Sequence, residues 1–165
     1  MRHDAVAAAV AAELQCNGYT TRREKVFRTE TGVRKPDILA AKGGKEHVLD
    51  VQIVSGSRPL SEAHKRKKDY YAGNAELMGG ISTLLEVSKE KMEVSTMTLT
   101  WRGVWAAESA ATLTNLGLSR NMMRKITTRI LQGSYMNFRR FNEMTTVFGG
   151  RERMRMSGWG PPREQ

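Results

Sequence analysis

The chain has 165 residues, a net charge of +10 at pH 7 and one cysteine, Cys16. One cysteine excludes a disulfide framework and a cysteine-rich zinc site within this chain, and it fits a reducing intracellular compartment. The sequence contains no apolar run near the roughly 20 residues that a membrane span needs, so we expect no membrane partner.

Hydrophobic periodicity and turn residues divide the chain into helices and strands. An apolar residue at every fourth position predicts a first helix, and the clearest strand is a later segment rich in valine. Glycines 117 and 133 are expected to interrupt the helical C-terminal part. The predicted helices are His3 to Gln15, Pro59 to Tyr71, Ala75 to Val87, Ala107 to Leu116 and Arg120 to Phe148. The predicted strands are Lys25 to Glu30, Lys35 to Lys42, His47 to Val54 and Val94 to Trp105.

This order of elements predicts an α/β fold with a mixed sheet flanked by helices. We expect one domain over residues 1–148, because the length suits a single core and no linker divides it. The remaining residues, 149–165, contain Gly, Pro and Arg with little periodicity, so we expect a basic, loosely ordered tail. The order of elements does not identify a function.

Two aspartates stand out because of the strands around them. Asp37 follows a proline at the start of one strand, and Asp50 lies inside an apolar strand, where a carboxylate is costly unless it is paired or binds a metal. The Gly43-Gly44 turn predicts a hairpin that brings both carboxylates to one cation. Mg²⁺ or Mn²⁺ would suit such a site and would activate water for phosphodiester cleavage. Alternatively, Asp37 shapes a turn and Asp50 pairs with a core cation.

The helix that follows the second aspartate is predicted to add a cation to this site. Phosphodiester cleavage benefits from positive charge near the reacting phosphate. The position two residues after Asp50 on the same strand face is Gln52, which carries no charge. Lys67 lies on the inward face of the next helix together with Tyr71. We therefore predict Lys67 as the catalytic lysine and Tyr71 as its support, with Lys68 as the alternative lysine.

Further basic side chains are predicted to contact phosphates and so to position a nucleic acid without reading its sequence. From Ala111 onward the chain has ten Lys or Arg against three Glu, a net charge of +7. Such an excess favours a polyanionic partner. The alternatives are a solvated basic surface with no partner and, for Arg124, an ordinary exposed helix position. The candidates are Lys35, Lys65, Arg66, Lys68, Arg120, Arg124, Arg129, Arg139 and Arg140.

Together these residues resemble the restriction-like, PD-(D/E)XK endonuclease domain of early-branching, site-specific non-LTR retrotransposons. The matching residues are Arg2-His3, Lys35-Pro36-Asp37, Asp50, and Lys67 with Tyr71, and the later matching segments are Trp101 to Trp105, Leu113 to Leu118 and Gly133 to Phe141. The resemblance implies a PD-(D/E)XK fold with extra C-terminal helices and a catalytic part for His3. The separation of His3 from Pro36 is long for this family, so a histidine that merely begins a helix remains the alternative.

The resemblance also implies a function. It indicates an endonuclease dependent on Mg²⁺ or Mn²⁺ that nicks double-stranded target DNA in the nucleus, so that the freed 3′ hydroxyl primes reverse transcription. The implied partners are the reverse transcriptase and zinc-knuckle regions of the same polyprotein, with the element RNA as a further candidate. Three alternatives stay open: a Holliday-junction-resolving nuclease, a non-catalytic nucleic-acid-binding module, and a structural or assembly protein.

Overall fold

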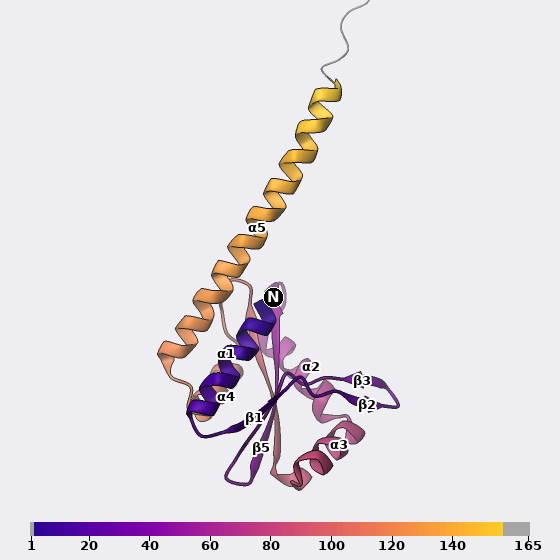
Figure 1. Ribbon diagram of the computed structural model, residues 1–165, viewed down its shortest axis with the longest axis vertical. Coiled ribbons are helices and arrows are strands. Elements are labelled where there is room, and N and C mark those ends of the chain that lie inside the picture. Colours follow the sequence, from indigo (N-terminus) through magenta and orange to yellow (C-terminus); the bar gives the residue numbers. More distant parts are fainter. Residues whose placement is uncertain (1, 157–165) are drawn as a thin grey trace, which may run out of the picture.

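A four-stranded mixed sheet carries helices on both faces (Figure 1). The computed structural model describes the backbone of residues 2–156 and the side chains of residues 3–145. The strand order is β1-β4-β5-β6, formed by Thr20–Arg23, Ile38–Lys42, Lys45–Val54 and Met92–Thr100. The first three strands are antiparallel neighbours, whereas β5 and β6 run parallel. Parallel strands need a long connection, and two helices supply it.

The helices divide between the two faces of the sheet. In chain order they are α1 (Arg2–Cys16), α2 (Leu60–Ala72), α3 (Ala75–Leu85), the short 3-10 helix η1 (Lys89–Lys91), α4 (Ala107–Asn115) and α5 (Arg120–Met156). Helices α1, α4 and α5 contribute to one hydrophobic cluster, and α2 and α3 contribute to another. Helix α5 extends far beyond the rest of the molecule (Figure 1).

The two faces differ in composition because side chains alternate along each strand. On the first face, Leu49 and Val51 of β5 pack with buried aliphatic residues of α1 and α5, and we call it the apolar face. On the second face, Val48 packs against Leu77 and Ile81 of α3, and Asp50 shares this face by alternation. We call it the site face.

A second, two-stranded sheet lies outside the main one. Its strands are β2 (Phe27–Thr29) and β3 (Gly32–Arg34), which pair antiparallel. Figure 1 shows this hairpin projecting beside α3 and away from the four-stranded sheet. We call residues Phe27–Arg34 the β2–β3 arm. It places the chain so that Lys35-Pro36-Asp37 leads directly into β4.

The predicted fold class is confirmed at the level of a mixed sheet flanked by helices, and most elements form where the sequence predicts them. Gly117, at φ +89°, separates α4 from α5 as expected. The predicted interruption at Gly133 is wrong, because α5 continues through it, and an interior glycine costs a helix only about 1 kcal/mol. The predicted helix end at Phe148 is also too early, since α5 continues to Met156.

The remaining differences concern strands and the C-terminal residues. The sequence pattern missed β1, β3 and η1, and the predicted strand Lys35 to Lys42 begins only at Ile38. The strand predicted to reach Trp105 ends at Thr100, where a turn begins. The predicted tail falls partly on residues 157–165, which lie outside the described residues, so the division at residue 148 stays a prediction. Over residues 2–156, none of the helices combines the length and apolar character that crossing a bilayer requires.

Candidate metal-binding and catalytic site

Asp37 lies at the junction between the β2–β3 arm and the main sheet. Ile38 pairs with Leu49, so extending this antiparallel register by one residue places Asp37 opposite Asp50. The backbone N–H of Val51 donates a hydrogen bond to Oδ2 of Asp37 over 2.7 Å. The side chain of Asp37 thus continues the ladder between β4 and β5 past the end of β4.

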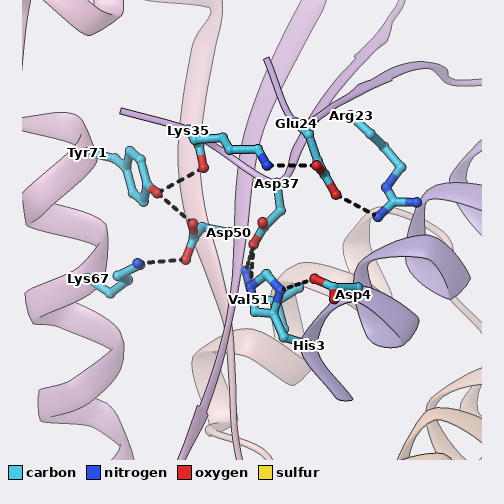
Figure 2. Close-up of polar contacts among 10 residues, drawn as sticks. All are labelled: His3, Asp4, Arg23, Glu24, Lys35, Asp37, Asp50, Val51, Lys67 and Tyr71. Carbon is cyan, nitrogen blue, oxygen red and sulfur yellow. Dashed lines mark hydrogen bonds and ion pairs between the residues drawn. The ribbon is translucent and has the colours of Figure 1, made fainter. Parts of the chain in front are cut away.

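Asp50 lies next to Asp37 but turns toward α2 (Figure 2). Its side chain is 5% exposed. The hydroxyl of Tyr71 donates a hydrogen bond to Oδ1 over 2.6 Å, and Nζ of Lys67 lies 3.1 Å from Oδ2. Lys67 and Tyr71 are one helical turn apart, so α2 presents both to the same carboxylate.

One oxygen of Asp50 retains an unused acceptor position. Oδ2 is buried and has no hydrogen-bond partner among the described residues, although the Lys67 ammonium is within ion-pair distance. The missing hydrogen bond and the short ion-pair distance are compatible, because the ammonium can attract Oδ2 by its charge without directing an N–H group at a lone pair of that oxygen. A buried carboxylate oxygen without a hydrogen bond is costly, which is the situation that a bound cation relieves.

The surroundings shift the acidity of Asp50 and Tyr71 in the same direction. Burial raises the pKa of Asp50, with a further rise from the charge of Asp37, while the Tyr71 hydrogen bond and the Lys67 charge oppose this rise. Burial and the hydrogen bond to Asp50 raise the pKa of Tyr71, so this hydroxyl stays protonated and remains a donor. The influence of Asp37 on Asp50 reflects the closeness of the two carboxylates.

His3 reaches the site from the start of α1. Its Nε2 atom lies 2.9 Å from Oδ2 of Asp37, and its Nδ1 atom lies 3.2 Å from the carboxylate of Asp4 (Figure 2). Helix α1 packs its apolar residues on the apolar face, which fixes the direction in which its first turn points. The histidine is therefore placed beside Asp37, on the side away from Lys67.

A hollow of about 400 Å³ adjoins Lys67 and Tyr71 on the solvent side. Its other lining residues are Val33, Arg34, Lys35, Gln52, Arg66 and Tyr70. The lining is rich in Lys and Arg, which suits an anionic ligand. Lys35 also pairs with Glu24 over 2.7 Å. The amide of Gln52 donates to the carbonyl of Ala63 and to Oγ1 of Thr98, so it ties α2 to the sheet.

Only part of the predicted basic set lies near this hollow. Arg66 lines it with Lys67, whereas Lys65 and Lys68 line a different hollow together with His64 and Glu108. The placement of Lys68 thus favours Lys67 over its alternative as the lysine beside Asp50.

The predicted arginines of α5 lie apart from α2. Arg129 and Arg140 line a third hollow with Ala5 of α1. Arg139 pairs with Glu143 over 2.8 Å, which engages its charge within the helix. Arg120 and Arg124 are exposed in the first turns of α5. Two of the five therefore lie near the first helix, whose start carries His3, and the other three do not line that hollow.

The donor set fits a hard divalent cation that keeps several waters. Among the described side chains, no group of three or more His, Cys, Asp or Glu residues forms a ready metal cage. Mg²⁺ is usually held by one or two carboxylates, with waters and substrate phosphate oxygens completing its octahedron. Asp37 and Asp50 would be the protein ligands, and the unused acceptor of Asp50 Oδ2 is consistent with that role.

Sequence reasoning missed two residues that border the site, Arg34 and Tyr70. The guanidinium of Arg34 lies 4.6 Å from the centre of the Tyr70 ring, and Lys67 Nζ lies 5.8 Å from the same ring. Arg34 belongs to a strand of three residues, which is too short to show a pattern. The adjacent tyrosines in Tyr70-Tyr71 are the signal that was present in the sequence.

Comparisons with known proteins point to one class of mobile element. The chain is 37% identical over 145 residues to the Pol polyprotein of a type-1 retrotransposable element R2 from Nasonia vitripennis, covering 88% of this chain and 14% of that protein. The corresponding protein of Bradysia coprophila is 34% identical over 146 residues, covering 88% of this chain and 16% of its own length. The Pol polyprotein of the type-2 element R2DM of Drosophila melanogaster is 28% identical over 141 residues, covering 85% of this chain and 13% of that protein.

The chain is thus homologous to segments of R2 Pol polyproteins and spans 13–16% of the length of these three relatives. No family model matches it. Among solved structures, a protein of unknown function aligns with a TM-score of 0.37 at 16% identity, covering 71% of this chain and 55% of that one. A likeness at this level does not define the fold family. The retrotransposon part of the sequence-based prediction is confirmed, and its endonuclease part stays a prediction.

Proposed function

We propose that this chain, a homologue of one segment of the R2 Pol polyproteins, is a restriction-like, PD-(D/E)XK endonuclease domain that nicks duplex DNA with Mg²⁺ or Mn²⁺. The observation that carries the proposal is the meeting of Asp37 and Asp50 at one end of the sheet, with Lys67 and Tyr71 on the buried carboxylate. A buried carboxylate with an unused acceptor, beside a second carboxylate and a basic hollow, supports metal-assisted phosphodiester hydrolysis.

Each side chain has a role that follows from its contacts. Asp37 and Asp50 would hold the metal, which supplies Lewis acidity and a more acidic bound water. Val51 fixes the position of Asp37 through its N–H, and Tyr71 fixes Asp50. The Lys67 ammonium lies beside Asp50 and would stabilise the negative charge that develops on the phosphate.

His3 and the basic hollow complete the proposed arrangement. The imidazole of His3 lies against Asp37, on the opposite side from Lys67, where it can orient the carboxylate or exchange a proton with a water molecule. Arg34, Lys35 and Arg66 line the hollow next to Lys67 and would contact phosphates that flank the cleaved bond. Contacts of this kind position a duplex without selecting its sequence.

The wider setting is also part of the proposal. The relatives are named as Pol polyproteins, and this chain matches only a small part of each. We therefore propose that the reverse transcriptase and zinc-knuckle regions of the same polyprotein are its partners, with element RNA as a further one. The nick would supply the 3′ hydroxyl for reverse transcription, and the site of action would be the nucleus.

The test is the nicking of supercoiled plasmid with Mg²⁺ or Mn²⁺ by the wild type, Asp37→Asn and Asp50→Asn. Asp69→Asn is the matched control, because Asp69 is an exposed carboxylate on the same helix as Lys67. We expect both site variants to lose about 100-fold or more in rate, since each removes a metal ligand, and the control to nick normally. Calorimetry with Mn²⁺ should show the same loss of binding without relying on catalysis.

The other outcomes separate the alternatives. Equal nicking by all four proteins would refute the assignment of the two aspartates. A wild type that binds duplex DNA but does not nick it would support a non-catalytic binding module. A dimer that cuts four-way junctions in preference to linear duplex would support the junction-resolving nuclease.

A further inference from the structure

The β2–β3 arm is a surface element whose role goes beyond the metal site. A two-stranded hairpin is marginally stable by itself in water, so an arm that keeps its position must be held by the body. Three contacts hold it. Phe27 belongs to the site-face cluster and packs so closely on Gly80 that a Cβ there would lie 3.1 Å from its ring. The N–H of Glu30 donates to Glu76 over 2.7 Å.

The third contact is at the turn of the arm, where Nδ2 of Asn74 lies 3.2 Å from Oγ1 of Thr31. Both Asn74 and Glu76 belong to the start of α3, and Asn74 also caps that helix by accepting from the N–H of Leu77. The arm is therefore fixed on α3 along one of its faces.

The opposite face of the arm is exposed and combines positive charge with apolar groups. Arg28 pairs directly with Val33 across the two strands, so both side chains stand on the same face, away from Phe27. Val33 is 61% exposed and the adjacent Val26 is 59% exposed. Arg28 supplies the positive charge of this face, and residues 25–35 as a whole contain four Lys or Arg and one Glu, a net charge of +3. The face therefore suits an anionic partner that also offers apolar contacts.

The arm is continuous with the proposed cleavage site. Strand β3 leads through Lys35 and Pro36 into Asp37, and Val33, Arg34 and Lys35 line the same hollow as Lys67 and Tyr71. A polyanion that leaves the metal site along this hollow therefore meets the arm next. Arg34, which rests on the ring of Tyr70, marks the junction between the hollow and the arm.

We propose that the exposed face of the β2–β3 arm enters the major groove of duplex DNA beside the cleaved bond. The major groove admits a two-stranded β-ribbon and presents both hydrogen-bond acceptors and thymine methyl groups. Arg28 would contact a base edge or a phosphate, and Val26 and Val33 would contact apolar base edges. The arm thereby gives the isolated domain a sequence preference at the cut. This inference rests on the proposed nuclease function for its choice of duplex DNA.

The experiment compares the wild type with the double variant Arg28→Gln/Val33→Ser and with the control Lys45→Gln. Lys45 begins β5 at the end of the sheet opposite to Asp37, and its replacement removes the same single positive charge. Dissociation constants are measured in Ca²⁺ for a fluorescent pool of random-sequence duplexes and for single-stranded RNA of the same length. The cut sites are then sequenced after nicking in Mg²⁺.

We expect the double variant to bind duplex about tenfold more weakly than the control and to choose cut sites with a weaker sequence bias. Unchanged Mn²⁺ binding and an unchanged melting temperature would show that the fold and metal site are intact. Equal affinity of the two variants for duplex, or a loss confined to RNA, would overturn the role of the arm. If the wild type does not nick, the nuclease proposal fails, whereas the affinity comparison still decides whether the arm binds duplex.

Discussion

The two faces of the central sheet use the same strands for different purposes. On the apolar face, hydrophobic side chains of neighbouring strands, such as Leu49 and Val51, form a continuous core with α1 and α5. On the site face, the intervening residues of β5 include the buried carboxylates of Glu46 and Asp50 and the amide of Gln52. A single strand of ten residues therefore alternates between stabilising the fold and carrying the polar groups.

The difference teaches how a buried carboxylate is tolerated in a small domain. The apolar face supplies most of the buried aliphatic residues, so the site face can include groups that oppose folding. Buried groups that oppose folding are common at sites where chemistry is performed, and the stability of the rest of the structure offsets their energetic cost. The comparison predicts that substitutions on the two faces differ in how much they change the free energy of unfolding.

The largest expected effect is on the apolar face. Leu49→Ala removes a fully buried side chain and should lower the free energy of unfolding by about 2–5 kcal/mol, because it leaves a cavity. The adjacent Asp50→Asn, on the site face, should change the free energy of unfolding by less than about 1 kcal/mol, because it removes a charge that burial disfavours. Urea denaturation followed by circular dichroism measures both. Equal losses for the two variants would contradict the division between the faces.

The next effect depends on pH and concerns Glu46. This side chain is 1% exposed, neither of its oxygens has a hydrogen-bond partner among the described residues, and burial raises its pKa from 4.5 to about 7. As the pH rises, the carboxyl group of Glu46 therefore loses its proton at a lower pH in the unfolded chain than in the folded protein. The contribution of Glu46 to stability should be fully present below pH 4.5, should fall by roughly 3 kcal/mol as the pH rises to about 7, and should be constant above that.

Glu46→Met should remove this part of the pH dependence, because methionine cannot ionise. Free energies of unfolding measured from pH 4 to pH 8 test it. Glu108→Gln, at an exposed position, is the matched control and should retain the wild-type slope. Equal slopes for the wild type and Glu46→Met between pH 4.5 and pH 7 would show that Glu46 is ionised at little cost.

A smaller effect is expected at the contact between the site face and α2. Tyr71→Phe removes the hydrogen bond to Asp50 and should cost about 1–2 kcal/mol of stability. Because this bond lowers the pKa of Asp50, its loss should raise that pKa further and move the acid limb of the nicking rate to higher pH. Tyr70→Phe, which removes an exposed hydroxyl, should cost less than about 0.5 kcal/mol. An acid limb that does not move would exclude Asp50 as the titrating group.

The smallest effect is expected on the surface, outside both faces. Arg58 and Glu62 form an exposed pair with an N–O distance of 3.8 Å. Glu62→Gln should change the free energy of unfolding by less than about 0.5 kcal/mol, because exposed pairs are well screened by water. A change as large as that of Tyr71→Phe would mean that surface charge, rather than the two faces, governs stability.

The central features of the site could be predicted because they depend on short-range regularities. The Gly43-Gly44 turn and the alternation of β4 and β5 bring Asp37 to Asp50. The four-residue separation of Lys67 and Tyr71 places both on one side of α2, where they meet the second carboxylate. Helix and strand periods are properties of the local sequence, so these neighbours follow from it.

Other features depend on long-range contacts that no local pattern reveals. Strand β1 is polar and pairs at the edge of the sheet with β4, so its residues show no hydrophobic alternation. The β2–β3 arm exists as a fixed element because of contacts with α3, about 50 residues later in the chain. Lys67 and Lys68 are adjacent in the sequence but line different hollows, because α2 lies between the two.

The hydrogen bond from the N–H of Val51 to Asp37 also supplies a reporter of the site that is independent of catalysis. Hydrogen–deuterium exchange at this amide follows local opening of the sheet edge, so its protection measures how often Asp37 leaves its place. A slip of one residue between β4 and β5 would send Asp37 to the other face and expose the amide. Slower exchange in the presence of a divalent cation would therefore reveal occupancy of the site even in a protein that cuts nothing.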